Sequence, residues 1–250
     1  MKDLYFLSDV HLGLGSKETE RRKRALLTDL LSEARDKAEH VFIVGDLFDF
    51  WFEYRHVVPR GHHAVLTALE QLSSAGVGVT YLAGNHDFGI GPSLAADLGI
   101  SIVKDDLLYD ADGRRFYLYH GDGLAVNDTG YRIIKAILRN RACQWMFRWL
   151  HPDIGFALAR LSSHSSRKYT ANKSVDKVDG MLREAQRRID EGASYVVMGH
   201  RHRATLQRLG AGVYVNLGDW LTSFSYAVFR EGRMHLVTRK RGIEESVSSE

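Results

Sequence analysis

The chain is 250 residues long, 44% apolar and 26% charged, with a net charge of +3, values that are ordinary for a soluble globular protein with a sizeable core. No apolar run approaches the ~18 residues of a membrane span, and the N-terminus leads directly into a strand-like run without signal-peptide architecture. Cys143 is the only cysteine, which excludes internal disulfides and thiolate metal sites and predicts a cytoplasmic protein.

Strand-like runs and helical spacings alternate along the first half of the chain. We expect strands at 3–8, 41–45, 77–82, 100–104, 106–109 and 115–119, with a change to antiparallel pairing in the last three. Helices are expected around residues 26–31, whose leucines share one face, over 61–74, and after the turn-rich residues 89–92.

The second half begins with a long helical segment. Between 124 and about 188 the strand signals disappear, which we interpret as a helical cap inserted into a single domain that covers 1–243. Strands return at 194–198, 204–208, 213–217, 224–229 and 234–239, and 244–250 is predicted to be a disordered tail. This pattern predicts an α+β fold with two packed sheets flanked by helices.

Five polar clusters follow, or closely follow, strand-like runs. They are Ser8-Asp9-Val10-His11, Gly45-Asp46-Leu47-Phe48-Asp49, Gly84-Asn85-His86-Asp87, His120-Gly121-Asp122 and Gly199-His200-Arg201-His202. Open α/β sheets bind ligands at the carboxyl ends of their strands, so we expect the five clusters to converge. In extended chain, residues i and i+2 point the same way, which lets Asp9 and His11 aim at one point. His200 and His202 have the same spacing.

The types of donor in these clusters indicate a dinuclear metal site. Carboxylates, imidazoles and the amide oxygen of Asn85, with no sulfur, suit Mn, Fe, Zn or Ni. Two cations ~3.5–4 Å apart need a charged bridge, for which Asp46 is the best candidate. Without a metal, the buried acids and imidazoles would carry a heavy desolvation cost. The histidines outside the clusters are interpreted as structural: His40, His56, His62, His63, His151, His164 and His235.

Taken in order, the five clusters resemble the motifs of the calcineurin-like metallophosphoesterases. The resemblance implies a four-layer αββα sandwich of two mixed sheets, with two divalent ions between the sheet edges and Mn²⁺ as the first choice. It assigns one ion to Asp9, His11, Asp46 and His202, and the other to Asp46, Asn85, His120 and His200. Besides Asp46, the catalytic candidates are His86, as donor to the leaving oxygen, and Asp87, which we expect to orient the His86 ring.

Three further stretches resemble the UDP-2,3-diacylglucosamine hydrolase subgroup. They are the aromatic and glycine additions in 46–51 and 85–91, the segment 127–132, and the segment 157–163. This resemblance implies cleavage of a pyrophosphate in lipid A biosynthesis, which releases UMP and 2,3-diacylglucosamine 1-phosphate. The best-known members carry Arg at the position of His86, so another anionic lipid or a soluble nucleotide is an alternative substrate.

The cap concentrates the positive charge. Residues 132–173 contain nine basic residues and one acid, Asp153, so this segment carries +8 and the rest of the chain −5. Together with apolar residues at helical spacing, this predicts a slot for acyl chains with a basic rim, on a surface able to rest on the cytoplasmic face of the inner membrane. The alternative is a cap whose apolar stripe packs on the core. Candidate substrate contacts are Asp128, Tyr131, Ser163, Arg167, Lys168 and Lys173.

Two aromatic segments have less direct interpretations. We expect residues 50–52 to have a structural packing role; the alternative is that they line the mouth of the active site. We expect residues 216–220 to support the His200/His202 loop or to pack as a turn.

The rival functions are a phosphodiesterase or phosphatase for soluble nucleotides and a non-catalytic binding scaffold. Nucleic acid is disfavoured, because the aromatic residues of the cap fall at helical packing intervals and not on a strand platform for bases.

Overall fold

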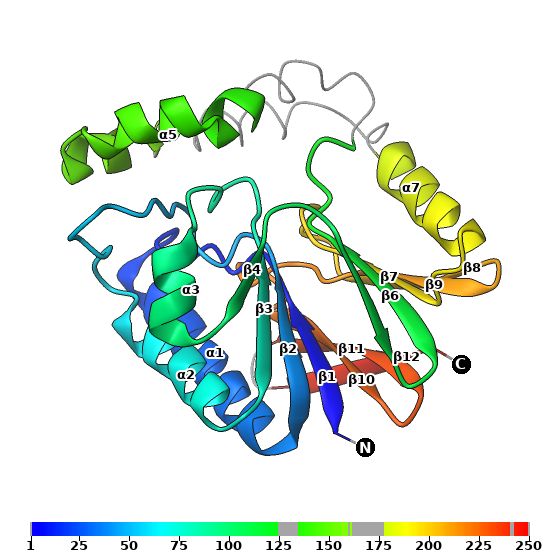
Figure 1. The fold of residues 1–250 in the computed structure, drawn as a ribbon. Coiled ribbons are helices and arrows are strands. Elements are labelled where there is room, and N and C mark those ends of the chain that lie inside the picture. The colour runs from blue at the N-terminus through cyan, green and yellow to red at the C-terminus, as the bar shows by residue number, and fades with distance from the viewer. Residues whose placement is uncertain (1, 125–134, 160, 162–177, 241–242, 250) are drawn as a thin grey trace.

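Apolar runs rich in valine, isoleucine and aromatic residues form two β-sheets that pack face to face in the computed structural model (Figure 1). The structure describes residues 2–124, 135–159, 161, 178–240 and 243–249. The seven-stranded sheet has the order β12-β11-β10-β1-β2-β3-β4, and the five-stranded sheet has the order β5-β6-β7-β9-β8. The predicted α+β sandwich of two mixed sheets is confirmed.

The first sheet contains a parallel half and an antiparallel half. The parallel strands are β1 (Asp3–Leu7), β2 (Ala38–Val44), β3 (Gly78–Leu82) and β4 (Ser101–Val103). The antiparallel strands are β10 (Ser225–Arg230), β11 (Arg233–Lys240) and β12 (Ile243–Ser248). Because β1, β2 and β3 are parallel neighbours, the loops that follow them leave the sheet at the same edge.

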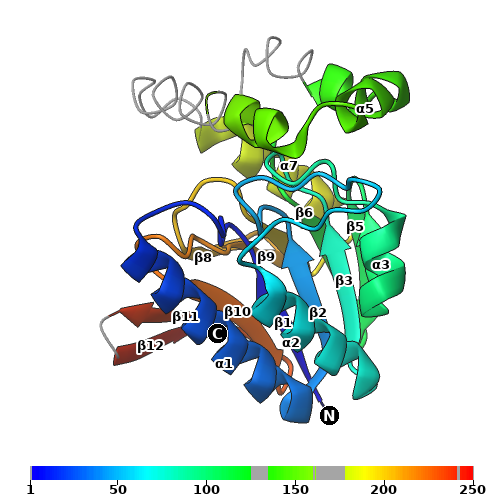
Figure 2. The same cartoon turned by 90° about the vertical axis from the view of Figure 1, so that its left-hand side faces the viewer.

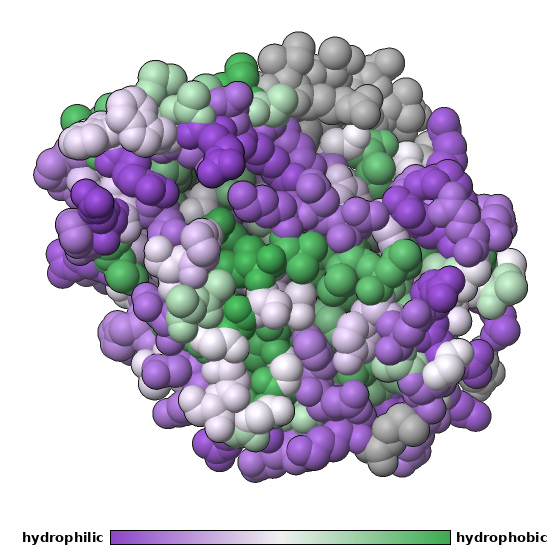
Figure 3. Space-filling model, in the orientation of Figure 1, coloured by the Kyte–Doolittle hydropathy of each residue, from purple (hydrophilic) through white to green (hydrophobic). Residues whose placement is uncertain are grey.

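The second sheet repeats this arrangement in a smaller form. Its central strands β6 (Arg114–Tyr119), β7 (Tyr195–Met198) and β9 (Gly212–Asn216) are parallel. Its edge strands β5 (Leu107–Ala111) and β8 (Thr205–Leu209) are antiparallel to their neighbours. The space-filling view shows hydrophobic residues gathered below the cap, over the edges of both sheets (Figure 3).

Helices cover the outer face of each sheet (Figures 1 and 2). The first sheet is covered by α1 (Lys17–Lys37), α2 (His63–Ser74) and α3 (Pro92–Leu98). The hydroxyl of Ser16 caps α1 by accepting from the amide of Thr19, and α3 begins at Pro92 and ends at Gly99, which has a φ of 64°. The second sheet is covered by α7 (Val178–Asp190). Together these elements make the four layers of the predicted αββα sandwich.

The core between the sheets is built from stacked aromatic rings. The ring of Phe6 stacks on Phe42 with centroids 5.1 Å apart and on Phe116 of the other sheet at 5.8 Å. All three side chains are fully buried. This contact between rings from both sheets fixes how the strand ends of one sheet face those of the other.

Two predicted boundaries are wrong. Residues 243–248 form β12 and not a disordered tail, because the backbone groups of β11 offer them a complete antiparallel ladder. The predicted cap extends too far, since α7 belongs to the core: Met181, Ala185 and Ile189 share one face and pack on the second sheet. The cap that the structure describes contains residues 135–139, α5 (Arg141–Arg148) and the helical residues 152–159.

The cap lies across the end of the sandwich (Figure 2), and an aromatic cluster forms one of its attachments. Phe50, Phe52 and Tyr54 of the loop after β2 pack against Phe147 and Phe156 of the cap. The closest ring pairs have centroids 4.7 and 5.0 Å apart. Residues 50–52 thus pack as predicted: Phe50 and Phe52 contact the cap, and Trp51 packs in the core of the first sheet. None of the described helices has the combination of length and apolar character that a membrane span requires.

We expect Phe42→Ala to lower the free energy of unfolding by about 3–5 kcal/mol, because it leaves a cavity between two sheets that cannot collapse onto it. Urea denaturation followed by circular dichroism measures this change. Leu108→Ala, which removes a side chain that is 57% exposed, is the control and should change stability by less than about 0.5 kcal/mol. Equal effects of the two substitutions would contradict the position of Phe42 in the core.

Candidate metal centre

Seven predicted donor residues meet where the carboxyl ends of strands from both sheets face each other. Each donor lies in the loop after a parallel strand. Asp9 and His11 follow β1, Asp46 follows β2, Asn85 follows β3, His120 follows β6, and His200 and His202 follow β7. The structure thus brings together every residue that the sequence assigned to the metal site.

The first donor group contains two carboxylates and two imidazoles. Nε2 of His202 lies 3.2 Å from Oδ1 of Asp9 and 3.1 Å from Nε2 of His11. Nε2 of His11 lies 3.7 Å from Oδ1 of Asp9 and 3.8 Å from Oδ2 of Asp46. Two donors that are each ~2.1 Å from one ion lie about 3.0–3.4 Å apart in octahedral or tetrahedral geometry. The observed spacings are close to that range.

The second donor group shares Asp46 with the first. Oδ2 of Asp46 lies 3.3 Å from Nε2 of His120. The amide oxygen of Asn85 lies 3.0 Å from that same nitrogen and 3.0 Å from Nδ1 of His200. Since one oxygen of Asp46 faces both groups, it occupies the place that a bridging ligand needs.

Each carboxylate uses one oxygen for the protein and keeps the other for the centre. Oδ2 of Asp9 accepts from the Ser8 hydroxyl at 2.6 Å and from the His200 amide at 2.8 Å. Oδ1 of Asp46 accepts from the amide of His86 at 2.8 Å. By contrast, Oδ1 of Asp9 is buried and has no hydrogen-bond donor among the described residues. A buried acceptor of this kind fits a cation.

The histidine tautomer is fixed where a ring nitrogen contacts a carbonyl. Nδ1 of His120 lies 2.8 Å from the carbonyl oxygen of Val44. A carbonyl can only accept, so Nδ1 carries the proton and Nε2 presents its lone pair to the centre.

Residues 216–220 support the His200/His202 loop, as predicted. The side-chain amide of Asn216 donates to the Gly199 carbonyl at 2.6 Å, and Oδ2 of Asp219 lies 3.9 Å from Nδ1 of His202.

The electrostatics of the centre oppose protonation of its carboxylates. Burial disfavours the charged form of Asp9, but its contacts with His11 and His202 outweigh this and hold the pKa well below the usual value. Burial also opposes ionisation of Asp46, whose pKa is nevertheless lowered by the charges of His120 and His86. In His11, burial is outweighed by the contacts with Asp49 and Asp9, and the pKa rises to about 10. The carboxylates therefore attract positive charge to this point.

Five of the donors have left-handed backbone conformations. Asp9, His11, Asp46, His200 and His202 have φ values of 54°, 47°, 55°, 68° and 54°. The predicted extended i, i+2 geometry of the two pairs is therefore wrong, because each pair lies in a tight loop beyond its strand and not within it. Such conformations cost of the order of 1–3 kcal/mol each and persist where surrounding contacts impose them.

Two glycines allow the loops to approach this closely. A Cβ on Gly84 would overlap the carboxylate and the backbone nitrogen of Asp46, and a Cβ on Gly199 would overlap Ser8 and the carboxylate of Asp9. The motifs require glycine at these positions, because each places a backbone in contact with a neighbouring donor.

The predicted pairing of His86 with Asp87 is wrong. The Asp87 carboxylate is fully buried and accepts from the hydroxyl of Tyr81, the amide of Gly84 at 2.7 Å and the amide of Leu47 at 2.9 Å. It joins the loops after β2 and β3. His86 is instead oriented by Asp49, whose carbonyl accepts from Nδ1 at 2.9 Å and whose carboxylate lies 3.5 Å away. Asp49 belongs to the second polar cluster of the sequence, but the spacing of the residues gave no reason to prefer it to Asp87 as the partner of His86.

The predicted substrate contacts lie outside the described residues: Asp128, Tyr131, Ser163, Arg167, Lys168 and Lys173. The structure does describe a small cavity beside Asn85, which is lined by Gly84, Asn85, Phe88, Asp122, Lys135, Leu138 and Arg139. Nζ of Lys135 lies 2.7 Å from the buried carboxylate of Asp122, so the first helical residues of the cap touch the loop that carries His120.

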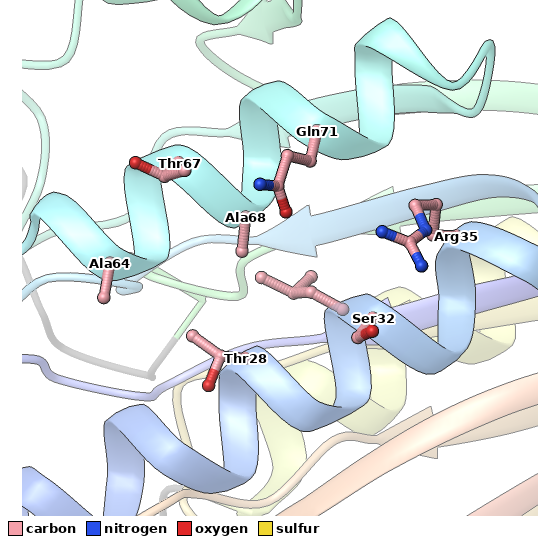
Figure 4. A pocket seen from close by; sticks show the side chains of 8 residues that line it. Thr28, Ser32, Arg35, Ala64, Thr67, Ala68 and Gln71 are labelled. Atoms are coloured by element: carbon pink, nitrogen blue, oxygen red, sulfur yellow. The ribbon is translucent and has the colours of Figure 1, made fainter.

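A larger groove of about 150 Å³ lies between α1 and α2 (Figure 4). It contains no donor of the metal centre, so we do not connect it with the chemistry.

Comparisons with known proteins agree with this geometry. The profile of the calcineurin-like phosphoesterase family matches residues 3–204. A UDP-2,3-diacylglucosamine hydrolase of Porphyromonas gingivalis is 31% identical over 90% of this chain and 93% of its own length. The corresponding protein of Haemophilus ducreyi is 30% identical over 88% and 92%. The fold is similar to that of wild-type Vps29 from Entamoeba histolytica complexed with Zn²⁺, with a TM-score of 0.52, 11% identity and coverage of 99% and 98%.

The shared oxygen of Asp46 leads to an asymmetric prediction for metal content. We expect the native chain to bind two divalent ions, Asp46→Ala to weaken both, and His120→Ala to weaken one, since His120 contacts the second donor group. Metal analysis after dialysis measures this, and turnover of either variant should be nearly abolished while its circular dichroism spectrum is retained. His63→Ala, an exposed histidine at the start of α2, is the matched control. Metal-dependent hydrolysis by Asp46→Ala at the native rate would refute the assignment.

Proposed function

The chain belongs to the calcineurin-like phosphoesterase family, and we propose that it hydrolyses the pyrophosphate of UDP-2,3-diacylglucosamine to UMP and 2,3-diacylglucosamine 1-phosphate. The family match and the Asp/His groups support a metal-dependent phosphoester hydrolase. The observation that carries the reaction type is the pair of donor groups that share Oδ2 of Asp46. The substrate follows from relatives that carry this name and align with about nine-tenths of the chain.

We propose Asp9, His11, Asp46 and His202 as ligands of one ion, and Asp46, Asn85, His120 and His200 as ligands of the other. Oxygen and imidazole donors suit Mn²⁺, which is our first choice, although Fe, Zn and Ni accept the same donors. Two such ions, when bound, lower the pKa of a water molecule toward neutrality and offset the charge of the phosphoryl oxygens. A covalent enzyme intermediate is therefore not required.

His86 is the residue of the chain that we assign to the leaving oxygen. Its ring lies beside the centre, 4.7 Å from the His11 ring, and its side chain is 16% exposed, so a substrate can reach it. The hydrogen bond to the Asp49 carbonyl fixes the ring plane, and the fixed plane allows a positioned contact with the substrate. Because the Asp49 carbonyl accepts the hydrogen bond from Nδ1, we assign to His86 the imidazolium form, which donates from Nε2 to the oxygen that departs, while the backbone amide of the same residue donates to Asp46.

The cap supports a lipid substrate. Of its apolar residues, Phe147 and Phe156 pack on the aromatic loop, but others remain open to solvent. The exposed fractions are 61% for Trp145, 58% for Met146 and 77% for Trp149, and Ile154, Leu158 and Leu161 are also exposed. In the described part of the cap, these exposed side chains favour an acyl slot over the alternative of an apolar stripe that packs on the core. We propose that it receives acyl chains and rests on the cytoplasmic face of the inner membrane.

A lipid substrate predicts a strong dependence on acyl length. Because each buried methylene contributes about 0.8 kcal/mol, shortening the acyl chains by four buried methylenes should lower kcat/KM by about 200-fold. The assay compares detergent-dispersed UDP-diacylglucosamines with soluble UDP-sugars, cyclic nucleotides and nitrophenyl esters. Equal or faster hydrolysis of the soluble compounds would favour the rival phosphodiesterase, and no hydrolysis by a chain loaded with two ions would favour the scaffold.

Membrane contact through the cap predicts a separate effect. The exposed rings of Trp145 in α5 and of Trp149, which caps the C-terminus of that helix, lie 6.0 Å apart, and Arg141 and Arg148 are exposed on the same helix. We expect the double variant Trp145→Ala/Trp149→Ala to bind anionic vesicles at least tenfold more weakly, because two aromatic anchors are lost. Vesicle co-sedimentation measures this, with Leu108→Ala as an exposed control on another face. Unchanged sedimentation of the double variant would place the contact elsewhere.

A further inference from the structure

Lys23 of α1 is a buried ammonium group beside the metal centre. Its exposure is 0%, and no other lysine or arginine in the described part of the chain is buried. Lysine is almost never fully buried unless its charge is paired. Burial lowers the pKa of Lys23, and the contact with Glu20 opposes that shift. Helix formation alone does not explain why a lysine, and not an apolar residue, is buried at this position.

The contacts of Lys23 all lie in or next to one loop. Nζ donates to the carbonyl oxygens of Val10 at 3.2 Å, His11 at 2.5 Å and Leu14 at 2.8 Å. It also forms an ion pair with Glu20, at 2.5 Å, whose second oxygen accepts from the amide of Gly13 at 2.7 Å. The ammonium group therefore gathers three carbonyls of the loop that carries Asp9 and His11.

The amide groups of the same loop point the other way. The amides of Asp9, His11 and Leu12 donate to the carbonyls of Gly45, Asp46 and Leu47, at 3.2, 3.0 and 2.9 Å. One side of the loop is thus joined to the Asp46 loop and the other side to Lys23. This pairing accounts for buried backbone groups that no strand satisfies. It also holds the left-handed conformations of Asp9 and His11.

Stability alone does not explain the choice of lysine. A buried ion pair is often no more stabilising than apolar side chains of similar size. Methionine at position 23 would fill the same space without desolvating a charge. Methionine has no N–H group, however, so it would not donate to the carbonyls of Val10, His11 and Leu14, which belong to the loop that carries the His11 ring.

We propose that Lys23 is a positioning residue for the first donor group, which holds the loop so that Asp9 and His11 meet His202 at one ion. This inference rests on the proposed dinuclear centre. It predicts a selective effect, since none of the Lys23 contacts involves the second donor group of Asn85, His120 and His200.

The test is Mn²⁺ binding to the full chain, followed by electron paramagnetic resonance and by titration of free Mn²⁺. The native chain should bind two ions with the spectrum of a coupled pair. Lys23→Met should bind one ion within about twofold of the native affinity and the other 10–100-fold more weakly, which is the effect of losing an outer contact of a metal ligand. Its spectrum should be that of an isolated ion at the same metal concentration.

The controls separate positioning from folding and from the proposed function. Lys37→Met makes the same substitution at an exposed position of α1 and should bind both ions as the native chain does. Glu20→Gln is the milder variant, with a smaller loss in the same direction, and it decides the matter if Lys23→Met does not fold. Native binding of both ions by Lys23→Met, or equal weakening of both, would overturn the inference. Failure of the native chain to bind two ions would overturn the dinuclear centre instead.

Discussion

The structure depends on the negative charge and the metal-ligating oxygen and nitrogen atoms that are concentrated at one point, where the two sheets face each other. Oδ1 of Asp9 and Oδ2 of Asp46 are withheld from the hydrogen bonds that satisfy their partner oxygens, and they face imidazole nitrogens at 3.2–3.8 Å. A folded protein tolerates buried acceptors in this state only if a cation compensates them. The strained backbone of five donors has the same explanation, since each loop adopts a costly conformation to deliver its side chain to the centre.

The support for this point comes from groups that never touch the proposed ions. Asp87 joins the loops after β2 and β3, Asn216 holds the loop of His200 and His202, and Lys23 holds the loop of Asp9 and His11. Each of them satisfies backbone groups that leave the ends of the strands, where no sheet ladder continues. The donors are therefore placed by a shell of polar contacts, which is how metal sites generally orient their ligands.

The cap is the part of the molecule to which we assign the apolar part of the proposed substrate. It is attached to the domain by aromatic packing on Phe50 and Phe52 and by the ion pairs of Lys135 with Asp122 and of Arg139 with Asp105. Between these attachments it leaves large apolar side chains in solvent, although such residues normally seek burial. That combination explains why a phosphoester hydrolase of this family would carry an insertion rich in both tryptophan and arginine.

The sequence alone determined the donor types, their order and the strands that present them, because ligand chemistry restricts residue identity and strand periodicity is local. The alternation of apolar runs and helical spacings also determined that two packed sheets are flanked by helices, whereas the four-layer αββα order followed from the resemblance to the family. Only the tertiary structure decided which carboxylate orients His86, because Asp87 is adjacent to His86 in sequence but is turned toward Tyr81, whereas the fold brings Asp49 beside the His86 ring from a distant loop. The same holds for β12, whose polar residues become a strand only where β11 offers an edge, and for Lys23, whose burial no spacing within α1 reveals. Contacts between different elements of the folded chain decided all three, and the spacing of residues within one element does not encode such contacts.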